Sequence, residues 1–423
     1  MISESNNGLK RGSRKPMLRP VEAFPVKIQG QEAICLRDPN RIAPKSLFLQ
    51  AGAAFVLALL DGQNDLRDIQ AAWMRRFGQL IPFEDIEGLI SQLDENLYLE
   101  GERFDRFLAE LEAEFAASPS RPAMMAGQAY AADPEDLTRQ LEAFYHHPAG
   151  PGRDPKPALL KPPRGLVAPH IDFDRGGHCY AWAYDRLTDS QPPGLVVVLG
   201  TAHSPTENYL IACDKDLDTP FGPLKCEKDL MADLAARSGP GLKAEEFIHR
   251  GEHSVEFQAV WLKSLYRNNE EIRVLPLLCG SFHQIIEAGQ GPEDVEAYRN
   301  ARDVLKELLS KWEKTKGRVL ILASVDLSHV GPQFGDGFRI TGPVQQEIRE
   351  HDLELLRLVT EGDSQGFYLK IAQEQDRRHV CGLPSLYTML RLLDDAEGQL
   401  LSYDQWVDET GQGLVSFASL IFP

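Results

Sequence analysis

Four short apolar runs, each followed within a few residues by a histidine, constrain the fold of this chain most strongly. The first, GLVVVLGTAH, holds the apolar residues Leu195 to Leu199 and ends at His203. It is rich in valine and lacks polar alternation, which is typical of a strand buried on both faces of a parallel sheet. The other three, RGLVAPH, RVLPLLCGSFH and RVLILASVDLSH, end at His170, His283 and His329.

This repeated pattern predicts the fold class, which is α/β with a central, mostly parallel sheet and flanking helices. From Gly165 onward, segments typical of strands alternate with segments typical of helices. The carboxyl ends of parallel strands meet at one edge of such a sheet, and ligands bind in the crevice beyond them. The histidines are too far apart in sequence for a local motif. We therefore expect a pocket that is assembled from distant segments.

Composition disfavours several classes of partner. The net charge of −18 over 423 residues disfavours nonspecific binding to nucleic acid or to anionic membranes. The longest apolar stretch, GAAFVLALL, is too short to cross a bilayer. Six scattered cysteines without a CxxC pair favour a reducing, cytoplasmic location. Residues 1–16 have no apolar segment of the secretory type, and we expect a disordered tail there.

Residues 17–100 are predicted to form a separate small α+β domain of winged-helix type. FPVKIQGQEAICLRD indicates two strands that turn near Gly30, and SLFLQAGAAFVLALLDG indicates a helix that ends at Gly62. DLRDIQAAWMRRFG indicates a second helix, capped by Asp65 and closed by Gly78. PFEDIEGLISQLDENLYLEG indicates a third helix and a short strand, LYLE. The third helix is acidic, which disfavours DNA recognition.

The pattern of residues 17–100 resembles the PqqD-like family, whose small winged-helix domains hold precursor peptides for modifying enzymes. The resemblance implies that a peptide could add as a strand to the sheet edge. A docking or dimerisation module is the alternative. Residues 101–120 are predicted to form a linker helix and a boundary at SPSRP, and residues 121–423 the larger α/β domain.

Acidic residues accompany the later histidines. EHSVEFQ places Glu252, His253 and Glu256 at the start of a predicted helix. Carboxylates beside an imidazole fix its tautomer and raise its basicity. ASVDLSH places Asp326 three residues before His329, close enough to orient that ring. These carboxylates are therefore candidates to orient the histidines of the predicted pocket.

VCGLPS places Cys381 just before a predicted helix near Pro384. A thiol at a helix N-terminus has a lowered pKa, so we expect a good nucleophile or metal ligand. The alternative is a buried, inert cysteine. Asp172 and Asp174 could add a ligand next to His170, although a turn into the next helix is the favoured interpretation. His283 is interpreted as a loop residue.

Six segments occur in the order and rough spacing of the Memo family: AGQAYAADPEDLTRQLEAF, APH, LGTAHSP, GEHSVEFQ, ASVDLSHVG and VCGLPS. The chain from near Arg121 to its end resembles that family. Memo proteins are similar in fold to class III extradiol dioxygenases, which use non-haem Fe(II) to open catechol rings. Bacterial members belong to the group named for a Memo protein, an AMMECR-type protein and a radical SAM enzyme (AmmeMemoRadiSam system protein B-like). The resemblance makes AMMECR-type and radical SAM proteins candidate partners.

The resemblance also assigns roles to individual residues. It implies three metal ligands, which are His170, His203 and Cys381. It implies catalytic or pocket-lining roles for four further residues, which are His329, Asp326, His253 and Glu256. This chain has APHID, TAHS, SHVG and CGL where the family commonly has APHAG, a histidine pair, CHWG and CGR. The residues around the ligands therefore differ, and the family's substrate does not transfer.

Two imidazoles and a thiolate form a competent site for Fe(II), zinc or copper. The leading hypothesis is a metal-binding protein with non-haem iron, or copper, redox or dioxygenase-type chemistry on a small molecule or peptide, with Fe(II) favoured. One alternative is a zinc metallohydrolase in which His329 is the general base. Another is a non-catalytic protein that binds a peptide or phospho-ligand. The sequence leaves open whether the protein is an enzyme.

Overall fold

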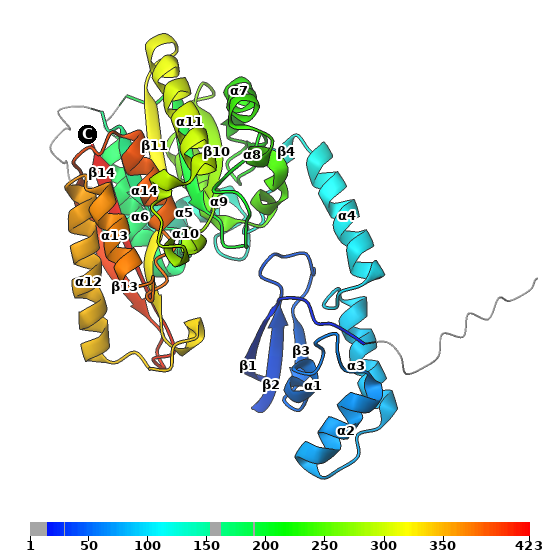
Figure 1. Ribbon diagram of the computed structural model, residues 1–423. Helices are drawn as coiled ribbons and strands as arrows, with labels where there is room; N and C mark the ends of the chain where they lie inside the picture. Colours follow the sequence, from blue (N-terminus) through cyan, green and yellow to red (C-terminus); the bar gives the residue numbers. More distant parts are fainter. Residues whose placement is uncertain (1–14, 29, 153–161, 189–190) are drawn as a thin grey trace, which may run out of the picture. The chain divides into compact units, whose positions relative to one another are not determined.

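The computed structural model describes residues 15–28, 30–152, 162–188 and 191–423 (Figure 1). The chain divides into two units, Met1–Ala117 and Ser118–Pro423. Most of the predicted N-terminal tail lies outside the described residues. None of the described helices is long and apolar enough to cross a membrane.

In its described residues, the first unit has a three-stranded antiparallel sheet followed by four helices. The strands pair in the order β1 (Glu22–Ile28), β2 (Gln31–Arg37) and β3 (Leu47–Gln50). The helices are α1 (Ala53–Leu57), α2 (Leu66–Phe77), α3 (Phe83–Glu95) and α4 (Glu102–Ala117). Helix α2 begins and ends as predicted, because the Asp65 carboxylate accepts from two main-chain amides and Gly78 adopts a left-handed conformation, with φ of 70°.

Two predictions for this unit are wrong. The start of the predicted first helix is strand β3, because Leu47–Gln50 pairs with β2 and buries Leu49. LYLE forms no strand among the described residues and makes only an isolated bridge, between Leu18 and Leu99. The winged-helix and PqqD-like assignment stays a prediction.

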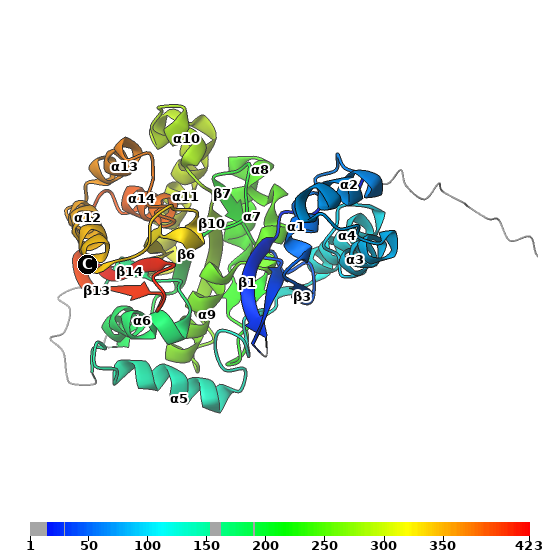
Figure 2. The same ribbon diagram turned by 90° about the horizontal axis from the view of Figure 1, so that it is seen from below.

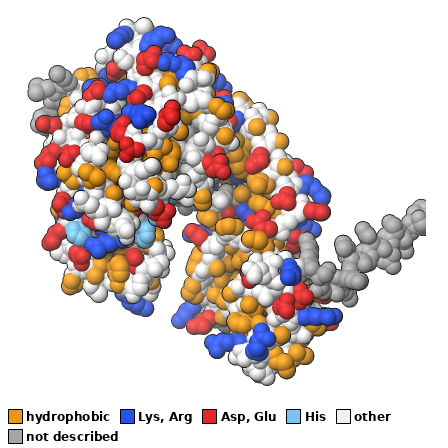
Figure 3. All heavy atoms as spheres, viewed as in Figure 1, with side chains coloured by type: hydrophobic (Ala, Val, Ile, Leu, Met, Phe, Trp, Pro, Cys, Tyr) orange, Lys and Arg blue, Asp and Glu red, His pale blue; other side chains and the backbone are white. Residues whose placement is uncertain are grey.

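Apolar side chains gather on the surface of this first unit (Figure 3). Several belong to α2, to the loop after it and to the start of α3, and these are Met74, Phe77, Leu80 and Phe83. Phe77 also packs against Trp73 and Phe55. The unit nevertheless has its own buried core, in which Leu36, Ile69, Ile86 and Leu93 are fully shielded from solvent.

The second unit is built on a nine-stranded sheet, which confirms the predicted fold class. Its strands run in the order β12-β14-β5-β11-β6-β10-β7, with β13 beside β14 and β9 beside β10. The parallel strands at its centre are β5 (Gly165–Ala168), β11 (Val319–Ser324), β6 (Leu195–Thr201) and β10 (Arg273–Cys279). The others are β7 (Leu210–Ala212), β9 (Lys225–Cys226), β12 (Asp326–Val330), β13 (Gln399–Val407) and β14 (Leu414–Phe422). A separate pair joins β4 (Ser120–Arg121) to β8 (Asp216–Leu217).

Helices cover both faces of this sheet (Figure 2). One face packs against α5 (Pro134–Tyr145), α6 (Phe173–Thr188) and α9 (His253–Leu265). The other packs against α7 (Lys228–Ser238), α11 (Glu296–Thr315), α12 (Gly342–Thr360), α13 (Ser364–Gln373) and α14 (Leu383–Leu392). Short helices, α8 (Gly241–Ala244), η1 (Glu246–Arg250), α10 (His283–Glu287), η2 (Pro292–Asp294) and η3 (Pro332–Phe334), lie in the connections. Val196 and Val197 face opposite cores, so β6 is buried on both faces as its sequence predicts.

Candidate metal centre

Three neighbouring strands deliver polar side chains to one edge of the sheet. His170, His203 and Asp326 each lie two residues beyond the end of β5, β6 and β11, respectively. Since β11 lies between β5 and β6, these residues meet although they are distant in sequence. The rings of His170 and His203 are perpendicular, with centroids 4.9 Å apart.

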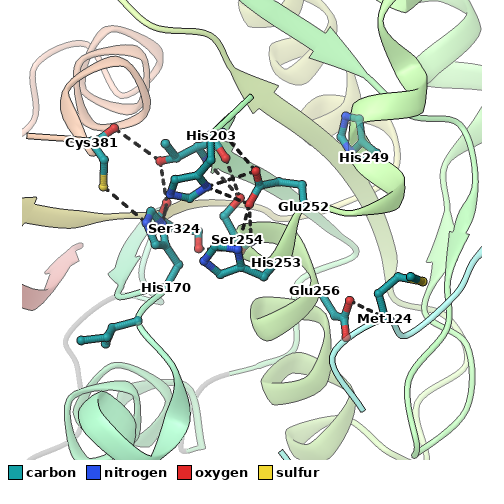
Figure 4. Close-up of polar contacts among 12 residues, drawn as sticks. Met124, His170, His203, His249, Glu252, His253, Ser254, Glu256, Ser324 and Cys381 are labelled. Carbon is teal, nitrogen blue, oxygen red and sulfur yellow. Dashed lines mark hydrogen bonds and ion pairs between the residues drawn. The ribbon is translucent and has the colours of Figure 1, made fainter. Parts of the chain in front are cut away.

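Cys381 joins this pair from the loop before α14 (Figure 4). Its Sγ lies 3.3 Å from Nε2 of His170. One ligand atom from each of His170, His203 and Cys381 falls within 4.8 Å of the other two. The three residues that the family resemblance implies as ligands are therefore brought together.

Close packing fixes the loop that carries the thiol. The Gly382 amide donates to the carbonyl of Asp326 at 3.1 Å. A Cβ on Gly382 would lie 2.6 Å from that carbonyl oxygen, so a larger residue does not fit there. Gln375, Asp376 and His379 in the same loop adopt left-handed conformations, with φ of 54°, 47° and 50°. Such conformations persist only where the surrounding contacts hold them.

The imidazole of His170 is held in the tautomer that metal binding needs. Its Nδ1 lies 3.0 Å from the carbonyl oxygen of Ser324, and a carbonyl can only accept, so Nδ1 carries the proton. Nε2, which faces Cys381, therefore keeps its lone pair. Burial, and then the neighbouring His203, lowers the pKa of His170 to about 3, so the ring is neutral at pH 7.

Glu252 orients His203 in the same way. Its carboxylate oxygens lie 3.0 and 3.1 Å from Nδ1 of His203, and one accepts from the His203 amide at 3.1 Å. Nε2 is thus the nitrogen available to a metal. Burial alone would lower the pKa of His203, but the charge and hydrogen bond of Glu252 outweigh it and raise that pKa. Burial opposes ionisation of Glu252 too, but His203 and then His253 hold its pKa well below the usual range.

A buried polar network from α9 holds the ends of β5, β6 and β11 in place, and the sequence analysis did not predict it. Ser254 Oγ donates to the Thr201 carbonyl and accepts from the Thr201 amide. The Gln258 side-chain amide donates to Ser324 Oγ at 2.8 Å and to the carbonyl of Pro169 at 2.7 Å. Ser254 and Gln258 are four residues apart on α9, so their helical spacing was the one available signal.

Three of the four predicted catalytic residues lie around this cluster. Asp326 is buried, accepts from the His170 amide at 3.0 Å, and has a pKa raised by burial. Burial lowers the pKa of His329 to about 4, and its Nδ1 lies 3.1 Å from the carbonyl of Leu327. The His253 ring stacks on His203, with centroids 4.8 Å apart.

The structure does not bring the fourth, Glu256, into the cluster (Figure 4). Its carboxylate is 1% exposed and pairs with the guanidinium of Arg121. It also accepts from the Tyr130 hydroxyl and from the amides of Met124 and Met125, at 3.0 and 2.8 Å. Glu256 therefore anchors the first segment of this unit, which no local sequence pattern could have indicated.

The expectation of a low pKa for Cys381 is wrong. Burial, and then the charge of Asp326, raises the pKa of this thiol well above its usual value. Gly382 separates Cys381 from α14, and the acceptors nearest to Sγ are Nε2 of His170, at 3.3 Å, and the Asp326 carbonyl, at 3.5 Å. Without a metal the side chain is a neutral thiol, and a bound cation would have to displace its proton.

The remaining polar candidates lie outside the cluster. Asp172 pairs with Arg175 one turn into α6, which fits the favoured interpretation as a turn into a helix. His283 is not the loop residue that the sequence predicts, because it begins α10. It lies 3.2 Å from Glu287, and its side chain is 60% exposed. The third apolar run forms β10 as expected, yet its histidine does not join the site.

Residues 121–421 match the Memo family model, described as Memo-like protein. A MEMO1 family protein of Aquifex aeolicus is 28% identical over 416 residues, which cover 96% of this chain and all of that protein. A MEMO1 family protein of Thermus thermophilus is 29% identical over 338 residues, covering 80% of this chain and 93% of that protein. These matches confirm the predicted resemblance of residues 121–421 to the Memo family.

A solved structure of an uncharacterized protein from Escherichia coli K12 also matches. It has a TM-score of 0.36 and 17% identity, and covers 61% of this chain and 99% of that chain. That likeness is too slight to support a conclusion about this protein.

Proposed function

Since the chain belongs to the Memo family, we propose that its second unit binds one transition-metal ion and uses it for oxidation–reduction chemistry on a small molecule or peptide. Fe(II) is the favoured ion and copper the next. The observation that carries the proposal is the convergence of donor atoms from His170, His203 and Cys381 within 4.8 Å. Two imidazoles and one thiolate suit these metals.

The protein residues fit a metal in three respects. Nδ1 of His170 and of His203 is turned to an oxygen acceptor, which leaves Nε2 of both rings for coordination. The His170 ring is neutral, as a ligand must be. The side chains of His203 and His253 are 39% and 30% exposed, so an ion and a substrate can enter from their side.

A bound Fe(II) or copper ion would supply electron transfer and Lewis acidity. The chain's own residues would bind, orient and handle protons. His329 is neutral, and its Nδ1 donates to a carbonyl, so Nε2 is the atom that would take a proton from a substrate. Asp326 holds the main chain of His170, and the stacked ring of His253 restricts the opening beside His203.

The metal content of the purified protein tests the proposal. Protein made and purified without oxygen is expected to hold about one Fe or Cu per chain, measured by elemental analysis. His203→Ala and Cys381→Ala should each lose most of that metal, because each removes one of three ligands. Cys35→Ala, in β2 of the first unit, is the matched control and should keep it. Unchanged metal content in both ligand variants would sink the assignment.

A zinc metallohydrolase is the second candidate, because the same donor set suits zinc and the neutral His329 keeps the lone pair of Nε2 to accept a proton. Elemental analysis separates the two. Stoichiometric zinc in colourless protein, with an activity that is insensitive to oxygen, would favour hydrolysis over oxidation–reduction chemistry.

A further inference from the structure

Arg121 is a buried arginine with no part in the predicted site, and each of its three guanidinium nitrogens donates a hydrogen bond. Nε donates to the carbonyl of His249 at 2.9 Å, and Nη2 donates to the carbonyl of Glu252 at 2.7 Å. Nη1 donates to the carbonyl of Pro122 at 2.9 Å and to the Glu256 carboxylate. The residue is only 1% exposed. One rigid fork thus ties together the end of η1 and the start of α9.

The Arg121 main chain is itself held in place. Arg121 belongs to β4, which pairs in parallel with β8, where Arg121 lies opposite Leu217. Its carbonyl accepts from the Asp218 amide at 2.9 Å. The guanidinium therefore acts from a fixed point. A planar fork loses less side-chain freedom per hydrogen bond than a lysine would, which suits it to hold two carbonyls at once.

Arg121 holds the main chain of Glu252, which is the residue that orients His203. The Glu252 carboxylate caps α9 by accepting from the Ser254 amide at 3.0 Å. The same carboxylate accepts from the amide and from Nδ1 of His203. These contacts require the segment after β6 and the start of α9 to stay at a fixed separation. Shifts of about 0.5 Å already degrade a functional arrangement of side chains. The main-chain position of Glu252 therefore determines where the His203 ring lies.

We propose that Arg121 is a positioning residue for the metal centre. It holds the main chain of Glu252 so that the carboxylate keeps the His203 ring with Nε2 turned toward His170 and Cys381. This inference rests on the proposed function for its effect on metal affinity, but not for its effect on the ring. Arg121 follows the boundary between the two units, and it lies 131 residues from Glu252 in sequence. No spacing in the chain relates the two residues.

The experiment compares full-length Arg121→Gln and Arg121→Lys with the unaltered protein. Arg302→Gln is the matched control, because Arg302 is also buried and paired with carboxylates, but on α11. Two quantities are measured. The first is the set of ring nitrogen shifts of His203 in metal-free protein, which report which nitrogen carries the proton. The second is the affinity for Co(II), read from the sulfur-to-cobalt absorption.

Arg121→Gln is expected to mix the two His203 tautomers and to weaken Co(II) binding by about ten- to hundredfold, as loss of an orienting contact does. Arg121→Lys should lie between, because lysine keeps the charge beside Glu256 but cannot reach both carbonyls. Arg302→Gln should bind Co(II) within about threefold of the unaltered protein. Should Arg121→Gln fail to fold, Arg121→Lys alone decides the question.

Two results overturn the proposal. The first is that the Arg121 variants have a lower unfolding temperature but the same His203 tautomer and the same Co(II) affinity as the unaltered protein. That result would mean that Arg121 only stabilises the fold. The other is an equal loss of affinity in Arg302→Gln, which would mean that any buried arginine has this effect. If the unaltered protein binds no Co(II), the proposed function fails, and the His203 tautomer still decides whether Arg121 positions the ring.

Discussion

At the scale of single residues, hydrogen-bond partners decide what each histidine of the second unit can do. His170 and His203 turn Nδ1 to an oxygen acceptor, which leaves Nε2 for a metal. His249 does the reverse, since its Nε2 lies 3.0 Å from the carbonyl of Ile211. Its buried ring has no role in the proposed chemistry. His249 can therefore be changed to measure how burial of a neutral imidazole affects stability without altering the proposed metal centre.

Stability of the second unit should fall in mild acid because of His249. Burial lowers its pKa to about 4, whereas an imidazole in the unfolded chain titrates near 6.5. Between these pH values the unfolded state binds the proton and the folded state does not. The contribution is therefore present above pH 6.5 and is lost as the pH falls toward 4, by about 2 kcal/mol between pH 7 and pH 5.

His249→Gln keeps a donor for the Ile211 carbonyl and removes the titration. Denaturant unfolding of the second unit at several pH values should show a smaller loss of stability in this variant than in the unaltered protein. Identical slopes of unfolding free energy against pH would show that His249 does not titrate as its burial implies.

At the scale of elements, the carboxyl ends of β5, β11 and β6 supply one wall of the site and the loop before α14 supplies the other. Gly382 sets how closely they approach, since a Cβ there would lie 2.6 Å from the Asp326 oxygen and 2.7 Å from Val325 Cβ. Both neighbours are buried and cannot move aside cheaply. The position of the Cys381 thiol therefore requires a residue without a Cβ atom at position 382.

Gly382→Ala is expected to lower the unfolding free energy by about 1–3 kcal/mol and to reduce metal content, because the loop with Cys381 must move outward. Gly337→Ala is the control, since a Cβ there meets no atom within 4 Å. Thermal unfolding and elemental analysis are the measurements. A variant at position 382 that is as stable and as metal-loaded as the control would contradict this account.

At the scale of the whole molecule, each unit has its own buried core. The first unit's core includes Ile86 of α3, and the second unit's cores lie on the two faces of its sheet. Units with separate cores tend to unfold as separate cooperative transitions. A ligand of one unit then stabilises only that unit.

Calorimetry should therefore resolve two transitions. Ile86→Ala removes fully buried atoms and should destabilise the first unit by about 2–5 kcal/mol while leaving the other transition in place. Added metal should raise only the transition of the second unit. A single transition that responds to both changes would show that the two units unfold together.

The sequence by itself determined the features that depend on local pattern. Valine-rich runs without alternation predicted strands buried on both faces, as β6 shows. Asp65 and Gly78 predicted the ends of α2, because capping groups act on neighbouring amides and carbonyls. The motifs around His170, His203 and Cys381 supplied the ligand candidates, which the fold brings together.

Only the tertiary structure decided what depends on partners far away in sequence. Leu47–Gln50 forms a strand because it pairs with the edge of β2. Glu256 points away from the site because it pairs with Arg121, which comes from another segment. The pKa of Cys381 is raised because burial, and then the charge of Asp326, opposes the thiolate form. Burial and long-range contacts determine these outcomes, and the local sequence around a residue specifies neither of them.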